Sequence, residues 1–154
     1  MTAPCPAPTL RPYRTGDEDA AIRLWQQAWQ LAYPDIDFAA RVPWWRERWQ
    51  RELVPAAKIM VAEVGGALAG FVTIDDTGYL DQIVVAPDQW GSGLASVLLT
   101  EAKRLSSGHV ALLVNADNHR AIRFYRKAGF RHVGDDVNPT SGRKVWRMEW
   151  TRVG

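Results

Sequence analysis

The segment VVAPDQWGSGLASVLL, residues 84–99, places the strongest limit on the folds open to this chain of 154 residues. A β-branched run enters a turn that contains Gly91 and Gly93, and a helical pattern of apolar residues follows at once. A strand that passes into a helix through glycines leaves backbone N–H groups bare at the positive end of the helix, where a phosphate can bind. The same glycines suit a plain turn, and the segment matches neither the Walker loop nor the Rossmann fingerprint. The pattern predicts a strand–helix unit and leaves its purpose open.

The spacing of apolar residues predicts the helices and strands of the rest of the chain. Patterns of strand length and of helical spacing alternate along the chain, and they predict the order β-α-α-β-β-β-α-β-α-β-β. A meander followed by two crossovers is typical of an α+β fold, with a central mixed, mostly antiparallel twisted sheet flanked by helices. The expected strands cover residues 9–15, 58–64, 67–74, 79–85, 109–116, 131–137 and 144–150, and the expected helices cover residues 16–33, 38–53, 92–106 and 118–128.

Composition and charge narrow the classes of protein. We expect a flexible, proline-rich tail over residues 1–9 and a single domain over residues 10–154. A lone cysteine, Cys5, excludes an internal disulfide, and no run resembles a signal peptide or a membrane span, so we expect a cytoplasmic protein. A formal charge of +2 with interspersed acids argues against a nucleic-acid partner. The three histidines lack metal-ligand spacing, so we expect no metal.

A second motif follows the glycine turn by one helix and one strand. It has the pattern N-x-x-A-x-x-x-Y-x-x-x-G-F, formed by Asn118, Ala121, Tyr125, Gly129 and Phe130. With both motifs in this order, the chain resembles the GCN5-related N-acetyltransferase (GNAT) superfamily. The motifs span residues 83–130, and the predicted element order matches the superfamily over almost the whole chain from Leu10.

The resemblance implies acetyl-CoA as the acetyl donor and direct attack by an amine in a ternary complex. It implies that Asn118 hydrogen-bonds the pantetheine arm and that Tyr125 protonates the departing thiolate. Strand-like backbone contacts with the pantetheine are implied for Ile83, Val84 and Val85. Contacts with the pyrophosphate are implied for Gly91, Ser92, Gly93, Leu94, Ala95 and Ser96.

Three positions depart from the family pattern. Trp90 stands directly before the first glycine, where relatives often carry Gln or Arg, and we expect a weaker polar grip on CoA. Ala95 replaces the last glycine, which is a common variant. Leu113 stands where ribosomal-protein N-terminal acetylases of the family carry Glu, which disfavours that peptide chemistry.

The amine must lose a proton, so a base or a path of waters is needed. Some relatives place the base on the strand before the glycine turn, where Asp81 matches the position of a catalytic histidine. Asp81 shares a strand face with Tyr79, and its alternative role is a solvated or salt-bridged carboxylate. Glu63 and Asp75 are weaker candidates. Cys5 lacks an evident activating partner and is not expected to be a nucleophile.

Structural roles compete with several of these functional ones. Tyr125 could be a core aromatic residue, and Asn118 could cap its helix with or without binding CoA. Trp44 falls off the core face of its helix, so it either borders the acceptor site or belongs to a dimer interface. Core positions are expected for Trp25, Trp29, Trp45 and Trp49.

We therefore predict an N-acetyltransferase that acts on a primary amine, with a small molecule favoured as the acceptor. The alternatives are acetylation of protein N-termini or lysines, and a non-catalytic acyl-CoA-binding module with a regulatory role. A homodimer is compatible with the sequence and is not demanded by it.

Overall fold

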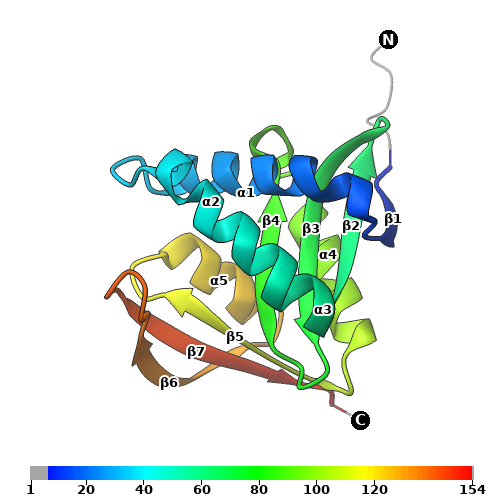
Figure 1. The fold of residues 1–154 in the computed structure, drawn as a ribbon. Coiled ribbons are helices and arrows are strands. Elements are labelled where there is room, and N and C mark those ends of the chain that lie inside the picture. The colour runs from blue at the N-terminus through cyan, green and yellow to red at the C-terminus, as the bar shows by residue number, and fades with distance from the viewer. Residues whose placement is uncertain (1–6, 154) are drawn as a thin grey trace.

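The computed structural model describes residues 7–153, so Cys5 and most of the predicted tail lie outside the described part (Figure 1). The predicted element order is found, with one added α-helical turn, α3, and two short 3₁₀ turns, η1 (Thr15–Asp17) and η3 (Pro87–Gln89). The strands are β1 (Thr9–Pro12), β2 (Ala57–Val64), β3 (Ala67–Asp75), β4 (Leu80–Val85), β5 (His109–Asn115), β6 (Arg131–Val137) and β7 (Lys144–Thr151). The helices are α1 (Glu18–Ala32), α2 (Phe38–Arg48), α3 (Val54–Ala56), α4 (Leu94–Leu105) and α5 (His119–Lys127).

The second predicted helix, residues 38–53, is not a regular α-helix to its end. After α2 the backbone widens into one π-helical segment, Trp49–Leu53, before α3. Pro43 lies inside α2 and removes one helical N–H donor there. The wider turn carries Trp49 and Leu53 into the core, where both side chains are buried.

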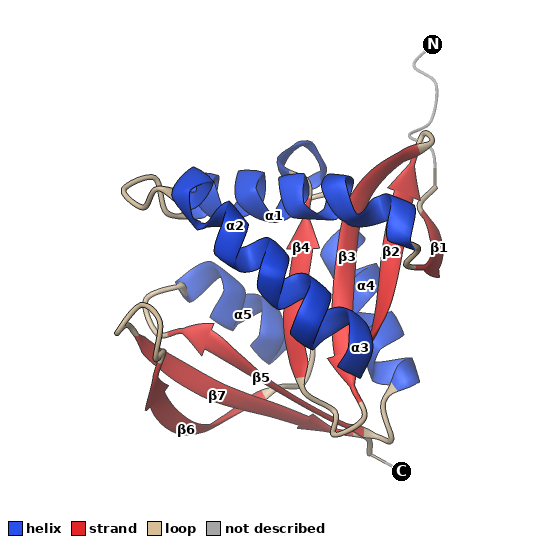
Figure 2. Ribbon diagram, in the orientation of Figure 1, coloured by secondary structure: helices blue, strands red, loops and turns tan. Residues whose placement is uncertain are grey.

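The strands form two antiparallel sheets in place of one continuous mixed sheet. The first has the order β1-β2-β3-β4 and the second has the order β5-β7-β6. A parallel bridge between Tyr79 and Ala111 joins them, and the N–H of Ala111 donates to the carbonyl oxygen of Gly78 at 2.8 Å. Beyond this bridge β4 and β5 diverge (Figure 2). The divergence opens the edge of β4 at the end that leads into the glycine turn.

A bulge bends β4 as it leaves the bridge. The register with β3 shifts between Val72 and Ile74, and the N–H of Gln82 donates to Thr73 Oγ1 at 3.0 Å. A bulge increases local twist and redirects a strand. The bulge therefore turns the end of β4 away from β5.

Two cores cover the two faces of the first sheet, with α1 and α2 on one face and α4 on the other (Figure 2). The core under α1 and α2 is aromatic: Trp25 stacks on Trp45 with ring centroids 4.7 Å apart, and Trp49 meets Phe71 edge-on. Trp25, Trp45 and Trp49 are buried, as predicted. Trp29 is only half-buried, because its side of α1 faces a cavity.

Within residues 7–153, no helix is long and apolar enough to cross a membrane. The same range contains no cluster of three or more His, Cys, Asp or Glu side chains that could hold a metal ion.

Candidate functional site

A cavity of about 420 Å³ lies where β4 and β5 diverge. Its walls come from α1, the end of β4, the glycine turn with the start of α4, and α5. Apart from Ser92, Asp81 and the two weaker base candidates, Glu63 and Asp75, every residue predicted to bind acetyl-CoA or to act in catalysis lines it. These residues are Ile83, Val84, Val85, Gly91, Gly93, Leu94, Ala95, Ser96, Asn118 and Tyr125.

The glycine turn presents unused backbone donors to solvent. Gly91 and Gly93 have φ of +84° and +91°, and a Cβ added at either position would meet nothing within 4 Å. The N–H groups of alternate residues are used internally: Ser92 donates to Gln89, and Leu94 donates to Ser92 Oγ. Among the described residues, no internal acceptor is found for the N–H groups of Gly91, Gly93, Ala95 and Ser96. Several bare donors at the N-terminus of a helix of 12 residues suit an anionic group.

Ser92 therefore differs from its neighbours in the turn. It does not line the cavity, and its hydroxyl oxygen accepts a hydrogen bond from the N–H of Leu94 at 3.3 Å. Its side chain stabilises the turn from within.

The free edge of β4 forms a second polar strip of the cavity. The N–H of Ala86 donates to the carbonyl oxygen of Ala69, so by the alternation of an antiparallel ladder the polar groups of Val85 point away from β3. They point toward the gap between β4 and β5. Trp90 Nε1 donates to the carbonyl oxygen of Val85 at 2.9 Å, which occupies one of these groups.

Asn118 caps α5 and borders the cavity at the same time. Its Oδ1 accepts from the N–H of Ala121 at 3.1 Å, as expected for an N-cap residue. The side-chain Nδ2 makes no hydrogen bond with another described residue, so a cavity ligand can use its N–H donors. The two predicted roles of Asn118 are compatible in one side chain.

Tyr125 is both a core aromatic residue and a lining residue. Its ring packs between Phe124 and Phe130, with centroids at 5.3 and 5.6 Å. Burial raises the pKa of the Tyr125 hydroxyl well above its ordinary value, so the group is protonated at neutral pH. No hydrogen bond from this hydroxyl is found within residues 7–153, which leaves its proton available to a ligand in the cavity.

Asp81 is engaged in an ion pair that crosses from β4 to α2. Both of its carboxylate oxygens accept hydrogen bonds from the Arg48 guanidinium, one of them at 2.9 Å, and Gln82 donates to it as well. Hydrogen bonding to Asp81 raises the pKa of Arg48. Tyr79 is no base at neutral pH, because burial and then the charge of Asp81 raise its pKa. Asp81 does not line the cavity.

The two weaker base candidates have structural partners. Glu63 accepts a hydrogen bond from Arg11 Nε at 2.7 Å. Asp75 accepts from the N–H groups of Thr77 and Tyr79 in the turn after β3. Burial acts to raise the pKa of Asp75, but hydrogen bonds from the Thr77 hydroxyl and from these backbone N–H groups lower it overall.

Sequence reasoning missed the wall contributed by α1. Ala28, Trp29 and Ala32 line the cavity, and Trp29 stacks on Tyr33 with centroids 5.8 Å apart. The small residues at positions 28 and 32 lie one helical turn apart on the side of Trp29, and this was the available signal of a helix face open to a ligand.

Tyr33 links the end of α1 to the second sheet. Its hydroxyl oxygen accepts from Asn115 Nδ2 at 2.8 Å, and the hydroxyl donates to Asp117 Oδ1 at 3.3 Å. Arg143, from the turn before β7, lies over the Tyr33 ring at 4.8 Å and pairs with Asp117 at 3.3 Å. These contacts join α1, which packs on the first sheet, to the second sheet on the side where β4 and β5 are apart.

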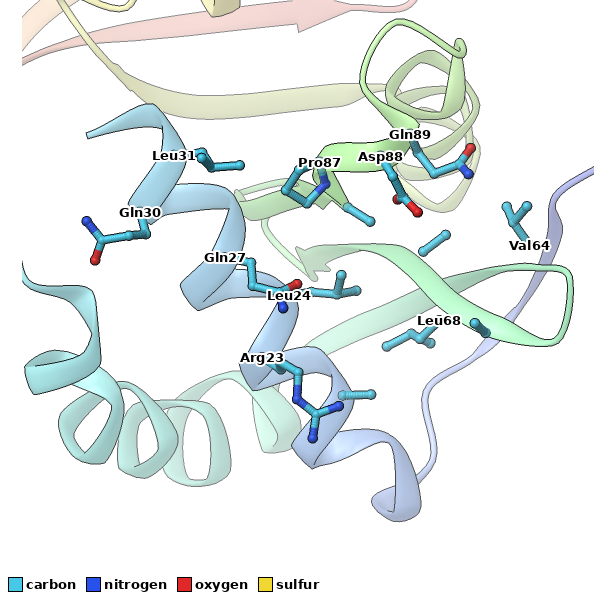
Figure 3. A pocket seen from close by; sticks show the side chains of 14 residues that line it. Arg23, Leu24, Gln27, Gln30, Leu31, Val64, Leu68, Pro87, Asp88 and Gln89 are labelled. Atoms are coloured by element: carbon cyan, nitrogen blue, oxygen red, sulfur yellow. The ribbon is translucent and has the colours of Figure 1, made fainter. Parts of the chain in front are cut away.

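A second and larger cavity, of about 820 Å³, lies on another side of α1 (Figure 3). Side chains of α1, including Arg23 and Gln27, approach it from one side, and residues 87–89 approach from the other. None of the predicted site residues lines it. The smaller cavity is therefore the candidate site, because it unites the bare backbone donors with Asn118 and Tyr125.

Comparison with known proteins finds similarity to acetyltransferases. The profile described as the acetyltransferase (GNAT) family matches residues 19–130. A mycothiol acetyltransferase of Kineococcus radiotolerans is 31% identical over 147 residues, which cover 86% of this chain and 46% of that protein. The peptidyl-lysine N-acetyltransferase YiaC of Escherichia coli is 26% identical over 147 residues, which cover 94% of this chain and 97% of that protein.

A structural relative shares the fold. The PaiA N-acetyltransferase of Thermoplasma acidophilum, solved in complex with coenzyme A, superimposes with a TM-score of 0.75. The match covers 94% of this chain and 99% of that chain, at 19% sequence identity. The present chain spans about half the length of the mycothiol acetyltransferase, whereas it spans nearly the whole of YiaC and PaiA.

Proposed function

Because the chain belongs to the acetyltransferase (GNAT) family, we propose that it transfers an acetyl group from acetyl-CoA to a primary amine. The family resemblance and the α+β fold class predicted from the sequence are both confirmed. The observation that carries the proposal is the cavity at the gap between β4 and β5. It combines an unpaired strand edge, a turn of bare N–H groups and a protonated phenol, which suit the pantetheine, the diphosphate and the departing sulfur of acetyl-CoA.

The proposed reaction is direct attack by the amine on the thioester carbonyl carbon. As the C–N bond forms, the C–S bond breaks, and Tyr125 gives its hydroxyl proton or a hydrogen bond to the thiolate. Negative charge develops on that sulfur as the bond breaks. A hydrogen-bond donor that is already protonated and partly desolvated stabilises this charge. No covalent intermediate with the protein is required.

The attacking amine also has to lose a proton. Asp81 is the first candidate for the base, but both of its carboxylate oxygens already accept hydrogen bonds from Arg48. We favour its alternative role as a salt-bridged carboxylate that holds α2 against β4. The amine proton then leaves through water, which is the second route that the reaction allows.

A small-molecule amine is the preferred acceptor. In support, Leu113 stands on β5 where a glutamate would serve peptide acetylation, and this residue is 39% exposed. The mycothiol acetyltransferase relative is named for a small molecule, mycothiol. Lysine side chains are the second candidate, because YiaC, named a peptidyl-lysine N-acetyltransferase, is matched over nearly its whole length.

Calorimetric titration with acetyl-CoA tests the binding part of the proposal. We expect saturable binding near one molecule per chain. Gly93→Val should weaken binding by about tenfold or more, because its side chain would enter the space that the diphosphate needs and φ is +91°. Gly66→Val is the matched control, because Gly66 has φ of +82° with the same open surroundings but lies in the β2–β3 turn. Equal affinity in all three proteins would place the CoA site elsewhere.

Thiol release measured with different acceptors tests the transfer. The acceptors are a panel of small primary amines and a lysine peptide with a blocked N-terminus. Faster turnover with a small amine supports the preferred acceptor, and faster turnover with the peptide supports the second candidate. Acetyl-CoA binding without thiol release from any acceptor would favour a non-catalytic acyl-CoA-binding module.

A further inference from the structure

The residue before the first glycine of the turn, Trp90, supports a cation that comes from another helix. Its indole is tied to the end of β4 by the hydrogen bond from Nε1 to Val85. The Arg120 guanidinium lies over the ring, with its central carbon 5.2 Å from the ring centroid. Trp90 and Arg120 both line the 420 Å³ cavity. An aromatic platform and a cation thus stand together beside the bare N–H groups.

Arg120 lies where its charge is poorly compensated by the protein itself. It occupies the second position of α5, and the positive end of a helix disfavours a cation. No carboxylate within residues 7–153 lies at ion-pair distance from it. The contact with Trp90 is a cation–π interaction, which stabilises an exposed cation only weakly. A bound anion would supply the missing compensation.

We propose that Arg120, held against Trp90, binds a phosphate group of the acyl-CoA substrate. The inference rests on the proposed function, because it places an acyl-CoA in the cavity. It assigns to Arg120 the polar contact expected of the Gln or Arg that Trp90 replaces. Trp90 is the positioning residue, since it acts through the guanidinium, and Arg120 is the residue that contacts the ligand. The phosphate is either part of the diphosphate or the 3′-phosphate, and both present the same oxygens to a guanidinium.

Calorimetry with CoA and with 3′-dephospho-CoA tests the proposal. We expect Arg120→Gln to weaken CoA binding roughly tenfold or more, because a charge-assisted hydrogen bond is lost. Arg123→Gln is the matched control: Arg123 is exposed on the same helix, does not line the cavity and should bind CoA as the wild type does. If Arg120 contacts the 3′-phosphate, its substitution will matter little for 3′-dephospho-CoA. If it contacts the diphosphate, the loss will persist with both ligands.

A double-mutant cycle tests the positioning role of Trp90. Trp90→Leu should weaken CoA binding severalfold in the wild-type background and have little further effect in Arg120→Gln. Affinity of the wild type should also fall more steeply with added salt than affinity of Arg120→Gln, because one cation–phosphate contact is missing in the variant. A merely structural role of Arg120 would leave the salt dependence unchanged. Thermal unfolding of each variant verifies that it is folded.

The outcomes separate this inference from the proposed function. If the wild type binds CoA and Arg120→Gln binds it with the same affinity, the inference is overturned and the proposed function is not. A wild type that binds neither CoA nor 3′-dephospho-CoA would overturn the proposed function and the inference together. Tighter binding by Trp90→Leu would show that the indole blocks the cavity, and would also contradict the positioning role.

Discussion

At the scale of single residues, the proposed chemistry depends most on Tyr125. Tyr125→Phe removes one oxygen and leaves the packing between Phe124 and Phe130 in place. We expect kcat to fall by about 10²–10⁴-fold, the usual contribution of a positioned acid, while CoA affinity changes little. Burial keeps the pKa of this hydroxyl above the assay range, so the ratio of wild-type to variant rates should stay constant from about pH 6 to about pH 9. Steady-state rates of thiol release across this range provide the measurement, and unaltered turnover would exclude Tyr125 as the acid.

Residues differ in how far the sequence could predict their roles. The two motifs that resemble the superfamily predicted that the glycine turn, Asn118 and Tyr125 belong to one site, and all three line one cavity; their roles stay predictions. The engagement of Asp81 with Arg48 was not predictable, since these residues are 33 positions apart and meet only after α2 docks on the sheet. The contact between Trp90 and Arg120 likewise depends on how α5 packs beside the glycine turn.

At the scale of elements, the site depends on the junction at which β4 and β5 part. Gly78 stands at this junction with φ of +85°, and an added Cβ would lie 2.3 Å from the carbonyl oxygen of His109. Gly78→Ala therefore forces the strands apart at their bridge, in addition to straining the backbone. We expect a loss of about 3 kcal/mol in the free energy of unfolding, measured by urea titration.

A matched substitution separates the clash from the backbone strain. Gly66 has nearly the same φ, +82°, but open surroundings, so Gly66→Ala should cost only about 1 kcal/mol. Equal losses in the two alanine variants would mean that the close approach at Gly78 does not hold the strands together.

The predicted strands were found at both sides of this junction, but the split into two sheets was not predictable. Apolar patterns specify which residues form strands, whereas strand divergence depends on the bulge in β4 and on a single bridge.

At the scale of the whole molecule, the cavity exists because two sheets meet at one end and are braced at the other. The bridge between Tyr79 and Ala111 joins the sheets at one end of the gap. The contacts of Tyr33 with Asn115 and Asp117 brace the open end. Trp29, stacked on Tyr33, forms part of the cavity wall. The contacts at the open end thus join segments that lie more than 80 positions apart in the sequence.

Substitution of Tyr33 tests whether this brace shapes the site. Tyr33→Phe keeps the ring between Trp29 and Arg143 but removes the hydrogen bonds to the second sheet, so we expect a stability loss of about 1 kcal/mol and CoA binding weakened about three- to tenfold. Tyr13→Phe is the control, because the Tyr13 hydroxyl accepts a hydrogen bond from Trp49 Nε1 in the core under α2 and does not line the cavity. It should lower stability by a similar amount and leave CoA affinity unchanged. Urea unfolding and calorimetry on both variants give the comparison. If both variants lose affinity together, the effect is one of general stability; if only Tyr33→Phe does, the brace between the sheets sets the geometry of the cavity.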